Sequence, residues 1–399
     1  MNKSIDTIVK QFKRKLGEQL KAIYLYGSFA QGFYQEGESD INLLIVVEEG
    51  TNLYILRDMF LPIWEAHGDL LKHAPFIAPY NAFVRHMQLN PMLAHHISRD
   101  GKQLFGTPNL LEAILPPIDG NNVYSHFANE VMDASKALVV DLLEPETAVS
   151  TKAHLRRILR RIRRAPLQKE ETAVQQFARI QHYLTPIIGK LQIAQQWATA
   201  QSAPSTSPIL PGLQTIYKTS GKMVFVFGQL TPQKILQTDW ARLAQFMDKR
   251  CEGIELTTVE QLCLAITYER PLNIPFRNFE HNWGADFLPT LTAAPKHIFR
   301  QAARRPSHIQ IASLPHAVLT QTDEALGTII HDFQNKMLNV QLEHELMVRL
   351  KLVERFTPPD PLPDRDTPPR QRIDTIFKQL QWWADFYTEQ MNQHAAWRK

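Results

Sequence analysis

Residues 22–47, AIYLYGSFAQGFYQEGESDINLLIVV, constrain the fold of this chain more than any other stretch. An apolar run from Ala22 to Tyr26 predicts a buried strand, and Gly27-Ser28 then predicts a turn. After a short amphipathic piece, a second apolar run from Ile41 to Val47 predicts another strand, which the chain enters through Ser39-Asp40. The stretch therefore predicts two buried strands that are separated by a polar connection.

The polar connection carries residues that suit phosphate chemistry. A Gly-Ser turn can bring backbone N–H groups close to a phosphate, because glycine lacks a Cβ and a helix N-terminus favours anions. Asp40 stands at the mouth of the second strand, where a metal-binding carboxylate could meet that phosphate. Gly27, Ser28 and Asp40 are therefore the candidate phosphate- and metal-binding residues.

This arrangement resembles the nucleotidyltransferase superfamily of the DNA polymerase β type, especially its aminoglycoside and minimal nucleotidyltransferase branches. The resemblance rests on Tyr26-Gly27-Ser28, on Asp40-Ile41-Asn42-Leu43 after a gap, and on the Ala30-Gln31-Gly32 step. It implies an α+β protein with an N-terminal mixed sheet and helices, followed by a mostly α-helical remainder. It also implies Mg²⁺-dependent transfer of a nucleoside monophosphate from an NTP, held by Gly27 and Ser28, to a hydroxyl of a small molecule or protein.

The sequence departs from the family at the metal site. The family has a second carboxylate where this chain has Asn42, and an amide offers a metal only a neutral oxygen. A third carboxylate is expected on the next strand, but the best candidate, Pro75 to Pro79, contains no acid. Two interpretations stay open: an active transferase whose metal is held by Asp40 and completed by Asn42, and a non-catalytic nucleotide-binding or scaffold protein.

Composition, with stretches rich in proline, glycine and serine, predicts the domain boundaries of the whole chain. We expect a nucleotidyltransferase-like domain at 1–116, a helical domain at 120–200, a Ser/Pro-rich linker, and a mostly helical domain of unknown role at 213–399. Within the last domain, Lys222 to Phe227 predicts a strand, and 240–249 and 257–268 predict helices.

An arginine-rich helix is predicted around residues 152–164. Its apolar side chains fall on one side and its arginines take the rest: Leu155, Ile158, Leu159 and Ile162 against Arg156, Arg157, Arg160, Arg161, Arg163 and Arg164. Arginine suits bidentate contact with phosphate, so an RNA-associated protein is a third interpretation, and a solvated helix face is the alternative.

Two further stretches carry functional side chains. His331, Asp332 and Asn335 resemble the His-Asp-x-x-Asn box of sensor histidine kinases, in which the acid orients the imidazole. The alternative is a polar seam between helices. Residues 278–288 gather Glu280, His281 and Asp286, which predict either a pocket lining or a turn that fastens helices together.

Composition excludes several classes of protein. No stretch approaches the roughly eighteen consecutive apolar residues of a membrane span. Cys251 and Cys263 are too few for a disulfide framework or a zinc site, which predicts a cytoplasmic protein. The net charge of +4 is mild, so an anionic partner would need a local basic patch.

Overall fold

The computed structural model describes residues 2–118, 148–161, 171–188, 212–239, 253–264, 279–355 and 366–396 almost completely, and scattered positions between these ranges. The chain divides into two compact units. Unit 1 contains Met1–Pro117 and Ile298–Lys399, and unit 2 contains Ile118–His297. The C-terminal helices thus belong with the N-terminal domain, while the predicted limits 1–116, 120–200 and 213–399 stay predictions.

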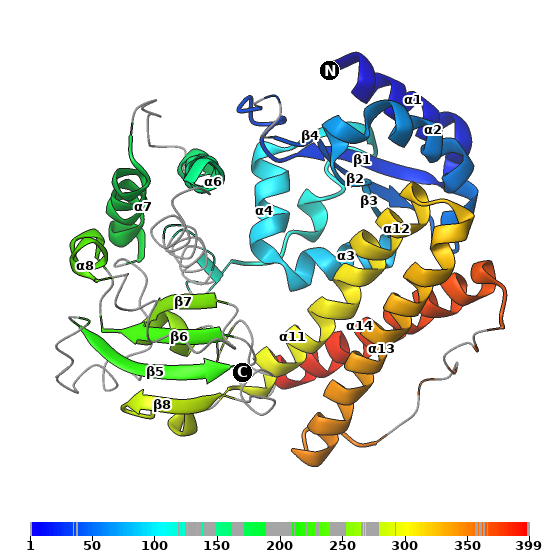
Figure 1. Cartoon of the computed structure of the whole chain (residues 1–399). Coiled ribbons are helices and arrows are strands. Elements are labelled where there is room, and N and C mark those ends of the chain that lie inside the picture. Colours follow the sequence, from blue (N-terminus) through cyan, green and yellow to red (C-terminus); the bar gives the residue numbers. More distant parts are fainter. Residues whose placement is uncertain are drawn as a thin grey trace. The chain divides into compact units, whose positions relative to one another are not determined.

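Unit 1 is built on a mixed four-stranded sheet with the order β3-β2-β1-β4 (Figure 1). Its strands are β1 Leu20–Tyr26, β2 Asn42–Val47, β3 Phe76–Pro79 and β4 Lys102–Gly106. Strand β1 runs antiparallel to β2 and β4, and β2 runs parallel to β3. The predicted N-terminal mixed sheet is confirmed.

Helices cover the sheet, which explains the continuous apolar runs of β1 and β2. Tyr24 of β1 belongs to a buried cluster with Phe83 and Met87 of helix Tyr80–Leu89, which follows β3. Ile23, the residue before Tyr24, points to the opposite face and is fully buried as well. The two central strands are therefore core on both faces.

The helices of unit 1 come from both ends of the chain. Those from the N-terminal part are α1 Asn2–Leu16, α2 Leu53–Leu71, α3 Tyr80–Leu89 and α4 Pro91–Asp100. Those from the C-terminal part are α11 Pro295–His308, α12 Leu314–Thr320, α13 Asp323–Arg349 and α14 Pro369–Ala396, with a π-helical segment Ile309–Ser313 between α11 and α12. The predicted helical C-terminal region is confirmed.

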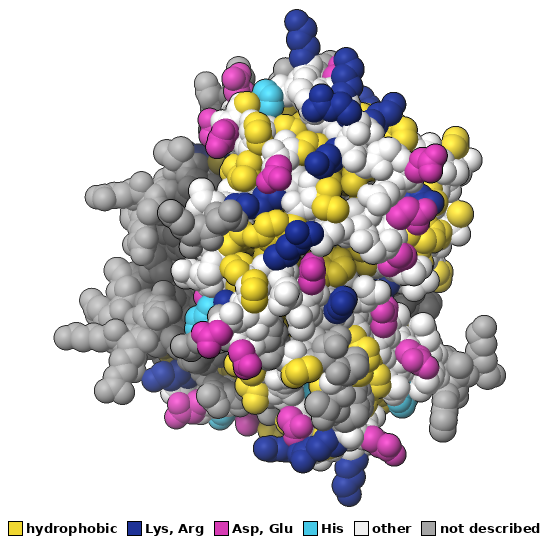
Figure 2. Space-filling model, turned by 90° about the vertical axis from the view of Figure 1, so that its right-hand side faces the viewer, with side chains coloured by type: hydrophobic (Ala, Val, Ile, Leu, Met, Phe, Trp, Pro, Cys, Tyr) yellow, Lys and Arg dark blue, Asp and Glu magenta, His cyan; other side chains and the backbone are white. Residues whose placement is uncertain are grey.

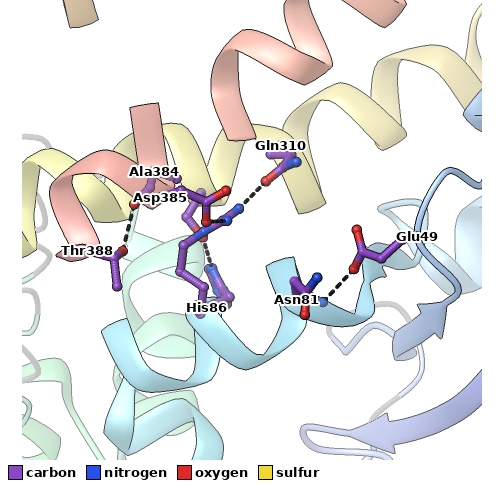
Figure 3. A network of polar contacts seen from close by, with 9 residues as sticks. Glu49, Asn81, His86, Gln310, Ala384, Asp385 and Thr388 are labelled. Carbon is purple, nitrogen blue, oxygen red and sulfur yellow. Dashed lines mark hydrogen bonds and ion pairs between the residues drawn. The ribbon is translucent and has the colours of Figure 1, made fainter. Parts of the chain in front are cut away.

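A buried arginine joins α3 to the C-terminal helices. Arg85 is only 4% exposed, and its Nη2 donates to Gln310 Oε1 at 2.5 Å. Its Nη1 forms an ion pair with Asp385 of α14 (Figure 3). Two segments that lie far apart in the sequence therefore share one polar contact.

Unit 2 contains a second four-stranded sheet, with the order β7-β6-β5-β8. Its strands are β5 Leu213–Thr219, β6 Lys222–Phe227, β7 Gly253–Thr258 and β8 Glu280–Gly284. Its described helices include α6 Ala148–Arg161, α7 Ala173–Ile188, α8 Pro232–Gln237 and α10 Val259–Leu264.

The sequence predicted parts of unit 2 correctly and missed others. The strand expected at Lys222 to Phe227 is β6, whereas β5, β7 and β8 were not predicted. The helix expected from Thr257 begins at Val259, because the β-branched Thr257 and Thr258 extend β7. The predicted linker and the helix at 240–249 lie largely or wholly outside the described residues.

The arginine-rich stretch is helical over the described part of α6, and its apolar side faces inward as predicted: Leu155, Ile158 and Leu159 are buried.

Among the helices that the structure describes, none combines the length and the apolar character needed to cross a bilayer.

Candidate active site

The site lies at one edge of the unit 1 sheet. Strand β1 ends at this edge, and the parallel strands β2 and β3 begin there, because β1 is antiparallel to β2. Tyr26 of β1 therefore pairs with Asn42, the first residue of β2. Phe76, the first residue of β3, pairs with Leu44, which lies two residues further along β2. Residues that follow β1 and residues that precede β2 and β3 are brought to the same place.

The backbone at position 27 requires a glycine. Its φ of +78° lies in the left-handed region, which strains any residue with a side chain. A Cβ at Gly27 would lie 2.8 Å from Nδ2 of Asn42. The backbone at the turn thus packs directly against the first residue of β2.

Asn42 in turn contacts Asp40. Its Nδ2 donates a hydrogen bond to Asp40 Oδ1 at 3.0 Å, and both residues are partly exposed. Burial raises the pKa of Tyr26 above its usual value, and the nearby Asp40 carboxylate adds to the rise. The structure therefore brings Gly27, Asp40 and Asn42 together, with one negative charge among them.

The turn after Gly27 is held by hydrogen bonds that also position Ser28. The Gln31 amide donates to the Gly27 carbonyl at 3.2 Å, and the Phe33 amide donates to the Ser28 carbonyl at 2.9 Å. The Gln31 side chain donates to Asp100 at the end of α4, over 3.3 Å. Asp100 was not predicted as part of the site, because it lies far along the chain and becomes a neighbour only in the fold.

The possible metal ligands at this edge are fewer than the family resemblance implies. The edge offers one carboxylate, Asp40, and the amide of Asn42, while the residues entering β3 include Ala74 but no acid. Among the described residues, no three His, Cys, Asp or Glu side chains are placed to hold a metal ion together. A Mg²⁺ carried by a triphosphate needs one or two protein carboxylates. The residues therefore fit one such ion at Asp40 and do not fit a bridged pair.

A pocket of about 560 Å³ opens beside the same edge. The Phe76 ring forms part of its wall and lies 6.2 Å from the Tyr26 ring, measured between centroids. The rest of the lining comes from the chain before β3 and from α11 to α13: His73, Ala74, His308, Ala312, Ser313, His316, Ala317, Gln321, Ile329, Asp332, Phe333 and Lys336. Ala312 and Ser313 belong to the π-helical segment, a feature that is frequent at functional sites.

The pocket is close to electrically neutral. His316 Nδ1 accepts the Ala74 backbone N–H at 3.1 Å, so the neutral ring carries its proton on Nε2. Burial and the neighbouring His73 lower the pKa of His316, and burial with Arg304 and Lys336 lowers that of His308. Asp332 and Lys336 also line the pocket, and the negative charge of the first balances the positive charge of the second.

The sequence did not predict this pocket, because its two halves are more than two hundred residues apart. Of the predicted His331, Asp332 and Asn335, all three are exposed on α13, and Asp332 lines the pocket. The side chains of His331 and Asn335 are not part of that lining.

The stretch 278–288 has a mainly structural arrangement in its described part. Every residue of β8 is exposed, which includes Glu280 and His281. Asp286 accepts a hydrogen bond from the buried Tyr217 hydroxyl at 3.1 Å, and that hydroxyl also accepts the Phe287 backbone N–H. Asn278 lies outside the described residues.

One protein family and two solved structures are similar to parts of this chain. Residues 5–91 match the nucleotidyltransferase domain family. A solved toxin–antitoxin structure with AMP-PNP shares 20% identity, covers 28% of this chain and 79% of its own, and has a TM-score of 0.21. The structure of spectinomycin adenyltransferase AAD(9) from Enterococcus faecialis, with ATP and spectinomycin, shares 14% identity, covers 49% and 92%, and has a TM-score of 0.27.

A search of curated protein sequences found no match. The two structural likenesses are too weak for an argument about function. The match of residues 5–91 and the mixed sheet with Gly27, Asp40 and Asn42 at one edge identify the N-terminal part of the chain as a nucleotidyltransferase domain.

Proposed function

We propose that unit 1 binds an NTP with one Mg²⁺ and transfers its nucleoside monophosphate to an acceptor hydroxyl. Gly27 and Ser28 would cradle the triphosphate, and Asp40 would ligate the ion. The observation that supports this most is that Gly27, Asn42 and Asp40 lie together at the sheet edge, where Phe76 lines a pocket of about 560 Å³. The predicted cytoplasmic location would supply both NTP and Mg²⁺.

The reaction would require little covalent chemistry from the protein. The acceptor oxygen attacks the α-phosphorus, the bond from that phosphorus to the bridging oxygen breaks, and pyrophosphate leaves. The bound ion would offset the negative charge of the phosphates. Asp332 lines the pocket and is proposed to take the proton from the acceptor hydroxyl.

The pocket favours a small acceptor without multiple positive charges. Its single acid, Asp332, is balanced by Lys336, and the lowered pKa values of His308 and His316 keep these rings neutral at pH 7. A polycation would meet no excess of carboxylates there. A neutral or acidic hydroxyl compound is therefore the proposed small-molecule acceptor, and a protein hydroxyl is the alternative.

A second candidate function is nucleotide binding without turnover. It is favoured by the hydrogen bond from Asn42 Nδ2 to Asp40 Oδ1, which occupies a carboxylate oxygen that a metal would otherwise use. A protein of this kind would hold NTP and Mg²⁺ but release both unchanged.

The transfer assay separates the two. The chain is incubated with each NTP labelled at the α-phosphate, Mg²⁺ and a library of hydroxyl acceptors. Transfer that Asp40→Ala abolishes supports the enzyme, and binding without transfer supports the second candidate. Asn42→Asp adds the missing carboxylate and is expected to raise Mg²⁺-dependent NTP affinity by about tenfold. No binding in any of these proteins would contradict both.

The role of Asp332 is tested in the same assay. Asp332→Asn is expected to lower kcat and to leave NTP affinity unchanged. His331→Gln is the matched control, because His331 is exposed on the same helix and does not line the pocket. Equal effects of the two substitutions would remove Asp332 from the mechanism.

A nucleic-acid partner is the least supported proposal. The arginines of α6 motivate it. The described residues on the face of the molecule in Figure 2 offer no second basic surface, because lysine and arginine side chains lie among aspartates and glutamates there. RNA binding that weakens steeply as salt rises would support this partner, and RNA binding unaffected by Arg156→Ala would contradict the proposed use of α6.

A further inference from the structure

We infer that unit 2 contains a second copy of the transferase sheet that has lost the nucleotide loop, so that the chain pairs one nucleotide-binding sheet with one that takes no nucleotide. The inference begins with topology. Both sheets have two central antiparallel strands, a third strand parallel to the second, and a fourth antiparallel to the first. Their orders, β3-β2-β1-β4 and β7-β6-β5-β8, correspond strand for strand.

The agreement extends to single residue pairs. The pairing of β1 with β2 shifts register between Leu20 and Ala22, and the pairing of β5 with β6 shifts between Leu213 and Thr215. These positions are equivalent, because both strands then continue without interruption to their last pairs. Those last pairs are Tyr26–Asn42 in the first sheet and Thr219–Lys222 in the second.

The pairing with the fourth strand has an irregularity at the matching position. In unit 1 it lies between Ile23 and Tyr24, and in unit 2 between Ile216 and Tyr217. The Ile-Tyr sequence itself is the same. Bulges are specific features of a strand pair, and two at equivalent positions are not expected from a shared strand order alone.

A glycine with the same constraint ends the fourth strand of each sheet. Gly106 has φ +112° and pairs with Ala22, and Gly284 has φ +86° and pairs with Thr215. A Cβ on Gly106 would collide with the carbonyl oxygen of Lys21, and one on Gly284 with that of Gln214. At equivalent positions, both glycines avoid a clash between a Cβ and a backbone carbonyl oxygen of the neighbouring strand.

The cores correspond as well. Tyr24 is buried with Leu44 and Val46 in unit 1, and Tyr217 is buried with Val224 and Val226 in unit 2. In both units a helix begins directly after the third strand, at Tyr80 and at Val259. Each of these helices places apolar side chains in the cluster: Phe83 and Met87 in unit 1, Val259 and Leu262 in unit 2.

The copies differ where the nucleotide site lies. In the first sheet, residues 27–41 connect the two central strands and include Gly27, Ser28 and Asp40. In the second, β5 ends at Thr219 and β6 already begins at Lys222. The residue equivalent to Asn42 is Lys222, which cannot ligate a metal ion while protonated. The scaffold is retained and the groups that would hold a triphosphate are gone.

The equivalence is tested by a matched pair of substitutions, Gly106→Ala and Gly284→Ala, read by hydrogen exchange. Each should speed exchange in its own sheet, β1 and β4 or β5 and β8, by about tenfold or more, because each new methyl meets backbone. Gly228→Ala is the control, since its Cβ would meet only the flexible Gln214 side chain at 3.3 Å. A silent Gly284→Ala would overturn the inference.

A cross-linking experiment covers the case in which a glycine variant does not fold. The inferred register places Ile216 opposite Trp283. Ile216→Cys with Trp283→Cys should form a disulfide on mild oxidation, and Ile216→Cys with Asn282→Cys should form much less. The reverse preference would contradict the shared register.

The nucleotide part of the inference rests on the proposed function and has its own test. Photolabelling with an azido-ATP should modify peptides of unit 1 and none within 213–284. A label in 213–284 that survives Asp40→Ala would overturn the assignment of unit 2 as nucleotide-free. If no peptide is labelled, the proposed function fails, while the glycine and cysteine pairs still decide whether the sheets are copies.

Discussion

Gly27 and Asn42 determine at the residue scale what this site can hold. The positive φ of Gly27 turns the chain at the end of β1, and the missing Cβ leaves room for the Asn42 amide. That amide then donates to Asp40, which leaves one carboxylate where the family resemblance implies two. The turn at Gly27-Ser28 is thus present, while the candidate metal site offers one carboxylate.

Gly27→Ala should lower both stability and nucleotide binding. A left-handed alanine costs about 1–2 kcal/mol, and its Cβ would also push on Asn42 Nδ2. Gly32→Ala is the control, because Gly32 has φ +79° and open space around its Cβ position. Urea unfolding should show a larger loss for Gly27→Ala, and ATP titration should show a loss for this variant alone. Equal losses would mean that the contact with Asn42 is unimportant.

The packing of α3 against α14 is decided at the scale of elements by Arg85. Its guanidinium is buried between Gln310 and Asp385, while the Asp385 side chain remains 54% exposed (Figure 3). The ion pair therefore joins a desolvated guanidinium to a carboxylate that stays partly hydrated. Removing Arg85 leaves Gln310 and Asp385 without their partner, whereas removing Asp385 leaves the buried guanidinium without its counter-charge.

Arg85→Met should destabilise unit 1 by about 2–3 kcal/mol, because Gln310 would lose a buried hydrogen-bond partner and α14 its ion pair. Asp385→Asn should have the smaller effect, about 1 kcal/mol, since water can replace part of an exposed pair. Thermal unfolding measures both variants, and exchange rates in α14 locate the loss. A larger effect for Asp385→Asn would show that the buried guanidinium does not tolerate the loss of its counter-charge.

We expect unit 1 as a whole to lose stability in acid, with His86 as a main contributor. The side chain is 2% exposed, and its Nδ1 lies 3.0 Å from the Ser307 hydroxyl. Burial, with the nearby His308, Arg304 and Arg85, lowers its pKa from 6.5 to about 3. The folded protein therefore keeps this ring neutral at pH values where the unfolded chain binds a proton.

The free energy of unfolding should fall as the pH is lowered from 6.5 towards 4. In this window only the unfolded chain takes up the His86 proton, so stability is complete above pH 6.5 and decreases by about 1.4 kcal/mol per pH unit below it. Urea titrations at several pH values measure this slope. His86→Gln removes the titrating group and should flatten the slope, and an unchanged slope would assign the acid sensitivity to other groups.

Local patterns in the sequence were sufficient to predict the first two strands, the turn at Gly27-Ser28 and the acid at Asp40. These features depend on apolar runs and on glycine geometry within a span of 26 residues, 22–47. The same reasoning found β6, because its apolar run is continuous, and missed β8, whose exposed residues carry no hydrophobic signal.

Only the tertiary structure decided which distant residues become neighbours. The pocket joins His73 to Asp332, Asp100 reaches the turn through Gln31, and the second sheet becomes visible only through strand pairing. Pairing partners and register depend on contacts between segments far apart in the chain, and such contacts leave little trace in local composition. The sequence alone thus determined the turn at Gly27-Ser28 and the amide at Asn42, while the fold decided what surrounds them and that a second sheet with a corresponding strand order is present.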